Sequence, residues 1–246
     1  MPAVHDWDED SALGRLWKTL AELAATRELS LSVDFVCDVA VERLAVTAAC
    51  LVVSNRPGSA TLRHASGALG DRAVEIEVTV GEGPVLESID LASSLFVPDL
   101  DAPRGYRHWP VFAPLAVEAG VRACLVFPLT VGVVRAGVLA LYHAEPGLPS
   151  TERLSEAMLF ADLLLALLLT EQAGRQAGAA ADEGFPLAGA AVHQATGIVA
   201  AQLDIDPDDA FARLRARAFA DGRRLAELAA DVVARRIRFD RNGDAG

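Results

Sequence analysis

Residues that most often carry covalent or metal chemistry are scarce in this chain. Its 246 residues include three cysteines, Cys37, Cys50 and Cys124, which lie far apart in the sequence. An odd number of cysteines at this spacing excludes a complete disulfide framework and fits no metal-site pattern. Each cysteine lies among apolar residues and is most simply a small core side chain.

Sequence motifs of common enzyme classes are missing as well. The five histidines are scattered without the spacing of a zinc site, and there is no P-loop, dinucleotide fingerprint or nucleophile motif. We therefore expect no catalytic residue and no metal site. The sequence identifies no cofactor.

A run of apolar residues long enough to cross a membrane is also absent. The most apolar stretch, residues 158–169, is interrupted by Asp162 and falls short of the roughly 20 residues that span a bilayer. The acidic start of the chain lacks the basic residues and apolar segment of a signal peptide. These features predict a cytoplasmic protein without a membrane partner.

Lysine is almost missing, since Lys18 is accompanied by 21 arginines, and the net charge of the whole chain is −12. The positive charge is unevenly spread. Between Ala210 and Phe239 there are eight arginines and three carboxylates, whereas the first 187 residues carry the whole negative balance. An acidic body with a locally basic C-terminal part repels nucleic acid everywhere except at that part.

The last quarter of the chain is predicted to form three short helices, because apolar residues recur there at helical spacing. The second helix has a distinct start: Asp206 is a suitable N-cap and Pro207 fits the first helical position. A turn at Asp221-Gly222 separates it from the third helix. The apolar positions of the three helices are Val192, Ala195, Ile198, Val199 and Leu203; Phe211, Leu214 and Ala218; and Leu225, Leu228, Ala229 and Val232.

This C-terminal pattern resembles the ANTAR domain, an RNA-binding antiterminator module built as a three-helix bundle. The resemblance covers residues 188–239 and leaves 240–246 as a tail. It implies binding to an RNA stem-loop in a nascent transcript. The family usually has a lysine where this chain has Thr196, so one basic side chain is missing. The segments that carry the resemblance are Gln194-Ala195-x-Gly197-Ile198, Ala210-Phe211-x-x-Leu214-Arg215-x-x-Ala218 and Leu225-Ala226-x-x-Ala229-x-x-Val232-Val233.

The charge pattern and this resemblance together indicate the side chains that contact RNA. Arg215 lies four residues from both Phe211 and Phe219, an arrangement suited to stacking on unpaired bases. Alternatively, both rings belong to the core and the arginine stem covers them. Arg213 and Arg217 face another side, either toward phosphates or toward solvent. The expected RNA-binding residues are Gln194, Thr196, Arg213, Arg215, Arg217, Arg223 and Arg224.

The chain is long enough for a second domain before this bundle. An N-terminal helix is expected within residues 1–24, a mixed domain over 25–172 and a linker rich in alanine and glycine over 173–187. Within the mixed domain we expect an irregular loop at 103–110 and an apolar segment at 76–80 of unassigned structure. Helices are predicted at 13–25, 32–45, 111–119 and 150–172, with a short one from 85, and strands at 48–54, 60–65, 95–97, 123–128 and 137–143.

Five short segments accompany this order of elements: Gly81-Glu82-Gly83-Pro84, Val97-Pro98-Asp99-Leu100, Trp109-Pro110, Phe127-Pro128-Leu129 and Gly137-x-Leu139-x-Leu141-Tyr142. Together they resemble the GAF domain, an antiparallel sheet with helices on one side and a pocket on the other. The predicted class is therefore α+β: a GAF-like antiparallel sheet flanked by helices, followed by an all-α three-helix bundle. Related regulators commonly have a cysteine where this chain has Val85, so thiol chemistry is not expected there.

GAF domains often bind small molecules or dimerise, so the resemblance implies a sensory role without naming a ligand. Alternatively, the tryptophan and proline of the irregular loop only cover the core, and Asp99 only caps a turn. A ligand pocket would be lined by Phe96, Asp99, Tyr106, Trp109, Phe127 and Leu139.

The helix predicted at 150–172 is apolar over more than one stripe, which exceeds what a one-sided amphipathic helix needs. We expect this excess to form a parallel homodimer together with the N-terminal helix. A dimer would hold two bundles in one particle and so raise their effective concentration for paired RNA stem-loops. A signal in the sensor would act through the linker.

The main hypothesis is a non-enzymatic cytoplasmic regulator that binds RNA to promote transcription antitermination under the control of a GAF-like sensor. Thr196 and the charge of −12 leave open a dimeric protein-interaction regulator that has lost RNA binding. A thiol enzyme on the same scaffold, such as a reductase of oxidised methionine, would need exposed and paired cysteines.

Overall fold

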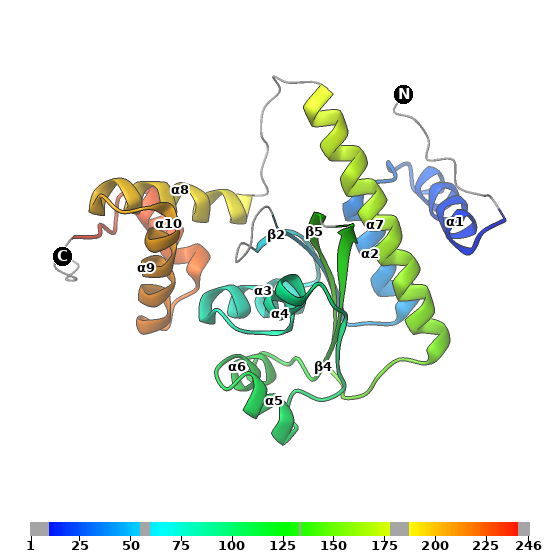
Figure 1. Ribbon diagram of the computed structural model, residues 1–246, viewed down its shortest axis with the longest axis horizontal. Coiled ribbons are helices and arrows are strands. Elements are labelled where there is room, and N and C mark those ends of the chain that lie inside the picture. Colours follow the sequence, from blue (N-terminus) through cyan, green and yellow to red (C-terminus); the bar gives the residue numbers. More distant parts are fainter. Residues whose placement is uncertain (1–9, 55–59, 133, 178–186, 241–246) are drawn as a thin grey trace.

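A computed structural model describes residues 10–54, 60–132, 134–177 and 187–240 (Figure 1). The described part of the chain up to Ala177 is called the sensor here, after its expected role. It contains the helices α1 (Ala12–Thr26), α2 (Val33–Leu44), α3 (Ala68–Val80), α4 (Pro84–Leu91), α5 (Pro103–His108), α6 (Phe112–Glu118) and α7 (Thr151–Ala177). Its strands are β1 (Ala48–Val53), β2 (Thr61–Ser66), β3 (Leu95–Val97), β4 (Ala123–Val131) and β5 (Val134–His143). The C-terminal bundle contains α8 (Leu187–Leu203), α9 (Pro207–Ala220) and α10 (Leu225–Val233).

The five strands form one antiparallel sheet in the order β2-β1-β5-β4-β3. Strand β5 lies at its centre, where Ala140 pairs with Cys50 of β1 and with Val126 of β4. The continuous apolar runs of β1, β4 and β5 fit these inner positions, because both faces of the sheet are covered. This arrangement confirms the predicted α+β class.

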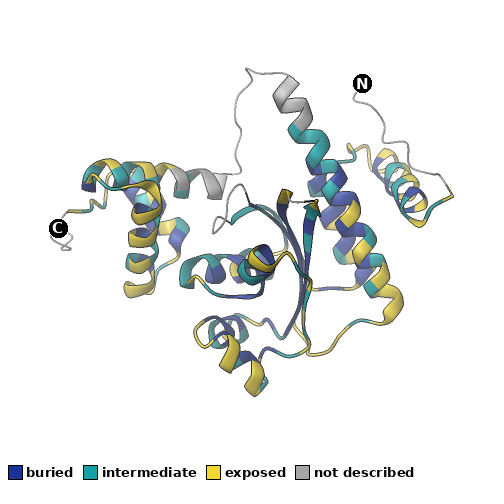
Figure 2. Ribbon diagram, in the orientation of Figure 1, coloured by how far each residue is buried: buried dark blue, intermediate teal, exposed yellow. Residues whose placement is uncertain are grey.

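Alternation along each strand sends side chains to two separate cores. In β1, Leu51 faces α1, α2 and α7, whereas Cys50 faces α3, α4 and α6. Figure 2 shows the inner strands of the sheet largely buried between these two groups of helices, whereas the edge strands β2 and β3 are only partly buried. The face expected to hold an open pocket is therefore packed with helices. Leu100, Trp109, Phe112 and Tyr142 belong to its core.

Helix α7 buries its apolar surface within the chain. Phe160, Leu164 and Leu168 belong to the core against the sheet and α2. Leu16 and Leu20 of α1 join the same core, and α1 contacts α7. Helix α1 therefore covers part of the apolar surface of α7 within the chain itself, while Met158 of α7 stays 55% exposed.

Two elements differ from the sequence expectations. The segment 76–80 is the end of α3, which already starts at Ala68, and the loop expected at 103–110 contains α5. Helix α3 was not recognised because its residues 76–80 alternate like a strand, a periodicity that short segments do not resolve. Among the described residues, no helix combines the length and hydropathy that crossing a membrane requires.

The C-terminal bundle has a small core of its own. Asp206 caps α9 by accepting hydrogen bonds at 2.9 Å from the backbone N–H groups of Asp208 and Asp209. Helix α7 continues to Ala177, and most of the expected linker and tail lies outside the described residues. The buried residues of the bundle are Ala195, Val199, Leu203, Ala210, Leu214, Ala218, Leu225, Leu228, Ala229 and Val232.

Candidate functional site

The arginines of α9 lie on two flanks of the helix. Ala210, Leu214 and Ala218 point into the bundle core. Because residues four apart share a side, Arg213 and Arg217 occupy one flank, and Phe211 and Arg215 occupy the other. The second flank faces α3 of the sensor (Figure 1).

Arg215 is the most enclosed of the predicted RNA-binding residues. Its Nε donates a hydrogen bond at 3.2 Å to the backbone oxygen of Thr79, in the last turn of α3. The guanidinium carbon lies 5.7 Å from the centre of the Phe211 ring. Burial lowers the pKa of Arg215. The expected partnership with Phe211 is therefore present, but in this arrangement it faces the sensor.

Arg224 bridges the bundle and the sensor. Its Nε contacts Glu75 Oε2 at 2.6 Å, and its Nη2 contacts Asp71 Oδ2 at 3.0 Å. These two carboxylates lie one turn apart on α3. Hydrogen bonding to Glu75 is the main reason that the pKa of Arg224 is raised.

Two other predicted arginines pair within the bundle. Arg217 Nε lies 2.6 Å from Asp221 Oδ2, and Arg223 Nη2 lies 2.5 Å from Asp231 Oδ2. Asp231 also accepts from Arg236 at 2.7 Å. Hydrogen bonds from Arg223 and Arg236 lower the pKa of Asp231.

The remaining predicted RNA contacts lie on open surface. Arg213 and Gln194 are exposed, and Phe219 keeps 55% of its surface exposed. Thr196 is partly buried, and its hydroxyl donates at 2.8 Å to the backbone oxygen of Val192 one turn earlier. The bundle thus presents Arg213 and Phe219 to solvent and turns Arg215 and Arg224 toward the sensor.

Glu77 is a fully buried carboxylate on the inner side of α3. Its Oε2 accepts from the backbone N–H groups of Val85 at 2.8 Å and Leu86 at 3.3 Å, at the start of α4. Tyr142 Oη lies 3.5 Å from its other oxygen. Loss of hydration raises the pKa of Glu77 to about 8, although these hydrogen bonds oppose the rise.

The Gly81-Glu82-Gly83-Pro84 turn joins three helices of the sensor. Glu82 Oε1 accepts from the backbone N–H groups of Val111 at 2.6 Å and Phe112 at 2.9 Å, which caps α6. A Cβ at Gly83 would overlap the Glu77 side chain. The turn itself is recognisable in the sequence, but the capping roles of Glu77 and Glu82 are not, because each carboxylate caps a helix to which it does not itself belong.

The six predicted pocket residues do not surround one space. Phe127 and Leu139 belong to the core that α2 and α7 cover, and Phe96 lies against Phe127 with ring centroids 5.4 Å apart. Trp109 belongs to the opposite core, where its Nε1 donates to Glu87 Oε2 at 3.1 Å.

The other two predicted pocket residues stabilise the loop after β3. Asp99 Oδ1 accepts from Arg122 Nη2 at 3.1 Å. Tyr106 Oη donates to Asp101 Oδ1 at 2.7 Å, and Asp101 also lies 3.5 Å from Arg122. Asp99 and Tyr106 are thus brought together through Arg122 and Asp101.

The three cysteines are free and buried, and burial raises the pKa of each thiol. A thiol nucleophile needs the opposite, a lowered pKa and access to solvent. Within the described ranges, no cluster of three or more potential ligands could hold a metal ion.

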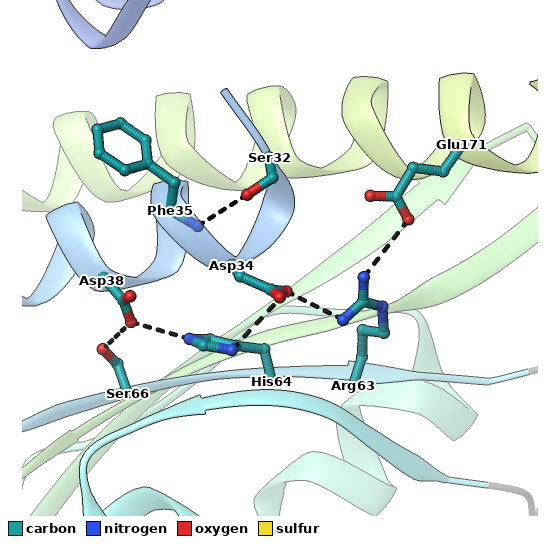
Figure 3. Close-up of polar contacts among 8 residues, drawn as sticks. All are labelled: Ser32, Asp34, Phe35, Asp38, Arg63, His64, Ser66 and Glu171. Atoms are coloured by element: carbon teal, nitrogen blue, oxygen red, sulfur yellow. Dashed lines mark hydrogen bonds and ion pairs between the residues drawn. The ribbon is translucent and has the colours of Figure 1, made fainter. Parts of the chain in front are cut away.

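A polar cluster ties the edge strand β2 to α2 and α7 (Figure 3). His64 Nε2 lies 2.8 Å from Asp38 Oδ1, and Arg63 Nη1 lies 2.9 Å from Asp34 Oδ1. The hydroxyl of Ser66 donates to Asp38 at 2.5 Å. Because this hydroxyl bonds the carboxylate and not the imidazole, the cluster lacks the nucleophile and base pairing of a serine hydrolase.

Solved structures with a similar arrangement include two GAF domains of phosphoenolpyruvate-protein phosphotransferases. The GAF domain of an Acinetobacter phosphoenolpyruvate-protein phosphotransferase is 12% identical, with a TM-score of 0.48 over 66% of this chain and 98% of that one. Its counterpart from Coxiella burnetii is 17% identical, also with a TM-score of 0.48, over 68% and 99% of the two chains. A search of curated proteins found no match.

Models of protein families match both parts of the sequence. The GAF domain model matches residues 30–168, and the ANTAR domain model matches residues 188–233. These matches confirm both resemblances seen in the sequence. The chain therefore belongs to the GAF domain family and carries an ANTAR domain after its sensor.

Proposed function

We propose that this protein binds RNA stem-loops through its C-terminal bundle and thereby promotes transcription antitermination in the cytoplasm. The ANTAR match is the observation that carries this proposal. The exposed Arg213 and Phe219 on α9 support it, since an arginine and an aromatic ring suit phosphate contact and base stacking. The acidic sensor directs RNA toward this bundle by repelling it elsewhere.

RNA binding is tested with the full-length chain and a pool of transcript leaders at two salt concentrations. The test variant is Arg213→Gln with Arg217→Gln, which removes two positive charges from one flank of α9. The control is Arg104→Gln with Arg107→Gln, which removes the same charge from exposed positions on α5. We expect the wild type to enrich stem-loops selectively. For the test variant alone, the plot of log affinity against log salt should become less steep by about 1.5.

A protein-interaction regulator without RNA binding is the second candidate. The observation in its favour is that Arg215, Arg217, Arg223 and Arg224 already contact groups of the protein itself. Equally weak, unselective binding of RNA by the wild-type chain and both variants would support this candidate.

The role of the sensor is to control the bundle in response to a small molecule. Its GAF family membership supports this role. Homodimer formation through α7 and α1 stays a prediction, and sedimentation equilibrium of the full-length chain measures it directly. A monomer at micromolar concentration would contradict it.

A further inference from the structure

Helix α3 belongs to the sensor and to the bundle interface at once. Its inner side buries Val74, Ile76 and Glu77 in the sensor core. Val78 packs both against this sensor core and against the core of the bundle. Any change in the position of α3 therefore alters contacts in both domains.

The outer side of α3 presents two carboxylates to Arg224. Asp71 and Glu75 lie one turn apart and bind different nitrogens of one guanidinium, at 3.0 and 2.6 Å. Only 10% of the Glu75 side chain is exposed, and its Oε1 is buried without a hydrogen-bond partner. The Arg224 and Asp71 side chains stay 43% and 42% exposed, so this is a partly exposed ion pair, and each of its two contacts contributes modestly to closure.

The C-terminal turn of α3 binds the second arginine. Arg215 donates to the backbone oxygen of Thr79, one of the carbonyl groups that a helix end leaves without a partner in the helix. Such a carbonyl carries partial negative charge from the helix dipole. Gly81, with φ +79°, ends the helix, and a Cβ there would overlap Arg215 Nη2. The absent side chain of Gly81 thus makes room for the guanidinium.

These α3 groups offer the arginines what an RNA phosphate offers: anionic or partly negative oxygens at hydrogen-bond distance. We propose that α3 is an internal competitor of RNA. In the closed arrangement, with Arg215 and Arg224 against α3, both arginines are withheld, and full RNA binding requires the bundle to leave α3. This inference rests on the proposed RNA binding and adds how the sensor controls it.

The closed arrangement is connected to the sensor interior through the Gly81–Pro84 turn. Glu82, within this turn, caps α6, and Glu77, one helical turn before it, caps α4. A sensor signal that displaces α4 or α6 therefore acts on the turn that shapes the Arg215 site. The coupling is a two-state equilibrium, closed or open, that a signal shifts through differential contacts.

The test variant changes only the sensor: Asp71→Asn with Glu75→Gln. Every bundle residue remains, so the RNA-binding surface itself is unchanged. We expect the affinity of the full-length chain for a labelled pool of transcript leaders to rise about 3- to 10-fold, because two charge contacts that favour closure are lost. The control, Asp90→Asn with Glu118→Gln, removes equal charge from exposed sensor positions and leaves the affinity within about twofold of wild type.

A second measurement follows the closed arrangement without RNA. Spin labels on Asp90→Cys in α4 and Ala220→Cys in α9 report the distance between sensor and bundle, since the native cysteines are buried. With wild-type residues at positions 71 and 75, we expect a single narrow distribution of distances between the two labels. For the test variant we expect a broader distribution with a longer mean distance. The charge exchange Glu75→Arg with Arg224→Glu should restore the narrow distance that Glu75→Arg alone abolishes.

The two measurements separate the possible failures. If neither the wild type nor the two variants bind RNA, the proposed function is wrong, and so is the proposed competition between α3 and RNA. If wild type and test variant bind RNA equally while the distance broadens, RNA binding stands and the competition alone is overturned. An unchanged distance together with unchanged affinity would also overturn it.

Discussion

The sensor and the bundle differ in how much core each builds for itself. Among the residues that the structure describes, the sensor buries 25 apolar residues on one face of its sheet and 19 on the other. The bundle buries ten, and four of these are alanines. A three-helix unit of this size gains little from burial alone, whereas the larger sensor is self-sufficient. The contact of Val78 with the bundle core therefore matters more to the bundle than to the sensor.

The sensor and the bundle also differ in the charge that each brings to their contact. At their contact, the sensor contributes Asp71 and Glu75, and the bundle contributes Arg224. The stable region thus supplies the anions, and the marginal region supplies the cations that RNA needs. This difference makes the bundle the part that moves when the contact is broken.

The largest expected effect tests the difference in core size. Leu214→Ala removes a fully buried side chain from the bundle and should cost about 3 to 4 kcal/mol of bundle stability. Hydrogen exchange should then accelerate in α8, α9 and α10, while the strands of the sensor keep their protection. Ala212→Ser, at an exposed position of α9, is the control. Equal loss of protection in both regions would show that they unfold as one unit.

The next effect concerns the sensor interior. The pKa of Glu77 is about 8 in the folded protein against an ordinary 4.5. Between these values the folded state keeps a proton that the unfolded state releases, so the free energy of unfolding falls as pH rises from about 4.5 to 8. Glu77→Gln should remove this fall, so its stability relative to wild type should rise by about 1.4 kcal/mol per pH unit between these two pKa values.

Urea unfolding at pH 5, 6.5 and 8.5 measures this prediction, with Glu118→Gln as the control at an exposed position. Parallel pH profiles for wild type and Glu77→Gln would contradict the buried, protonated carboxylate. The ten buried residues described in the bundle core include no ionisable side chain, so we expect this pH dependence in the sensor and not in the bundle core.

A smaller effect is expected at the start of α9. Asp206→Ala removes the acceptor for two backbone N–H groups and should destabilise the bundle by about 1 kcal/mol. Asp206→Asn keeps an acceptor and should be nearly neutral. Thermal unfolding followed by circular dichroism measures both. Equal melting temperatures for the alanine and asparagine variants would rule out a capping role.

The smallest effect is expected from thiol blocking. Cys37, Cys50 and Cys124 should react with a thiol reagent only as fast as the protein opens, because all three are buried and their pKa values are raised. An Ala220→Cys variant should react at once and serves as the positive control. Rapid modification of a native cysteine in the folded protein would revive the thiol-enzyme alternative.

Local rules accounted for much of the fold. We could predict the Asp206-Pro207 start of α9 and the apolar runs of the inner strands, because caps and strand patterns depend on neighbours in the sequence. Helix α3 could not be predicted, because apolar and polar residues alternate in its last turn as they do in a strand. The pocket prediction grouped Phe127 with Trp109, although the sheet separates them.

The sequence alone determined that an acidic sensor precedes a basic three-helix unit, because composition and periodicity are properties of the chain itself. It also identified the arginines of α9 and those just before and after α10 as a group. Only the tertiary structure decided which of them face solvent and which face α3. The ion pairs of Arg224 with Asp71 and Glu75 join residues about 150 positions apart. No local pattern encodes such a contact, because it depends on how two separately folded surfaces meet.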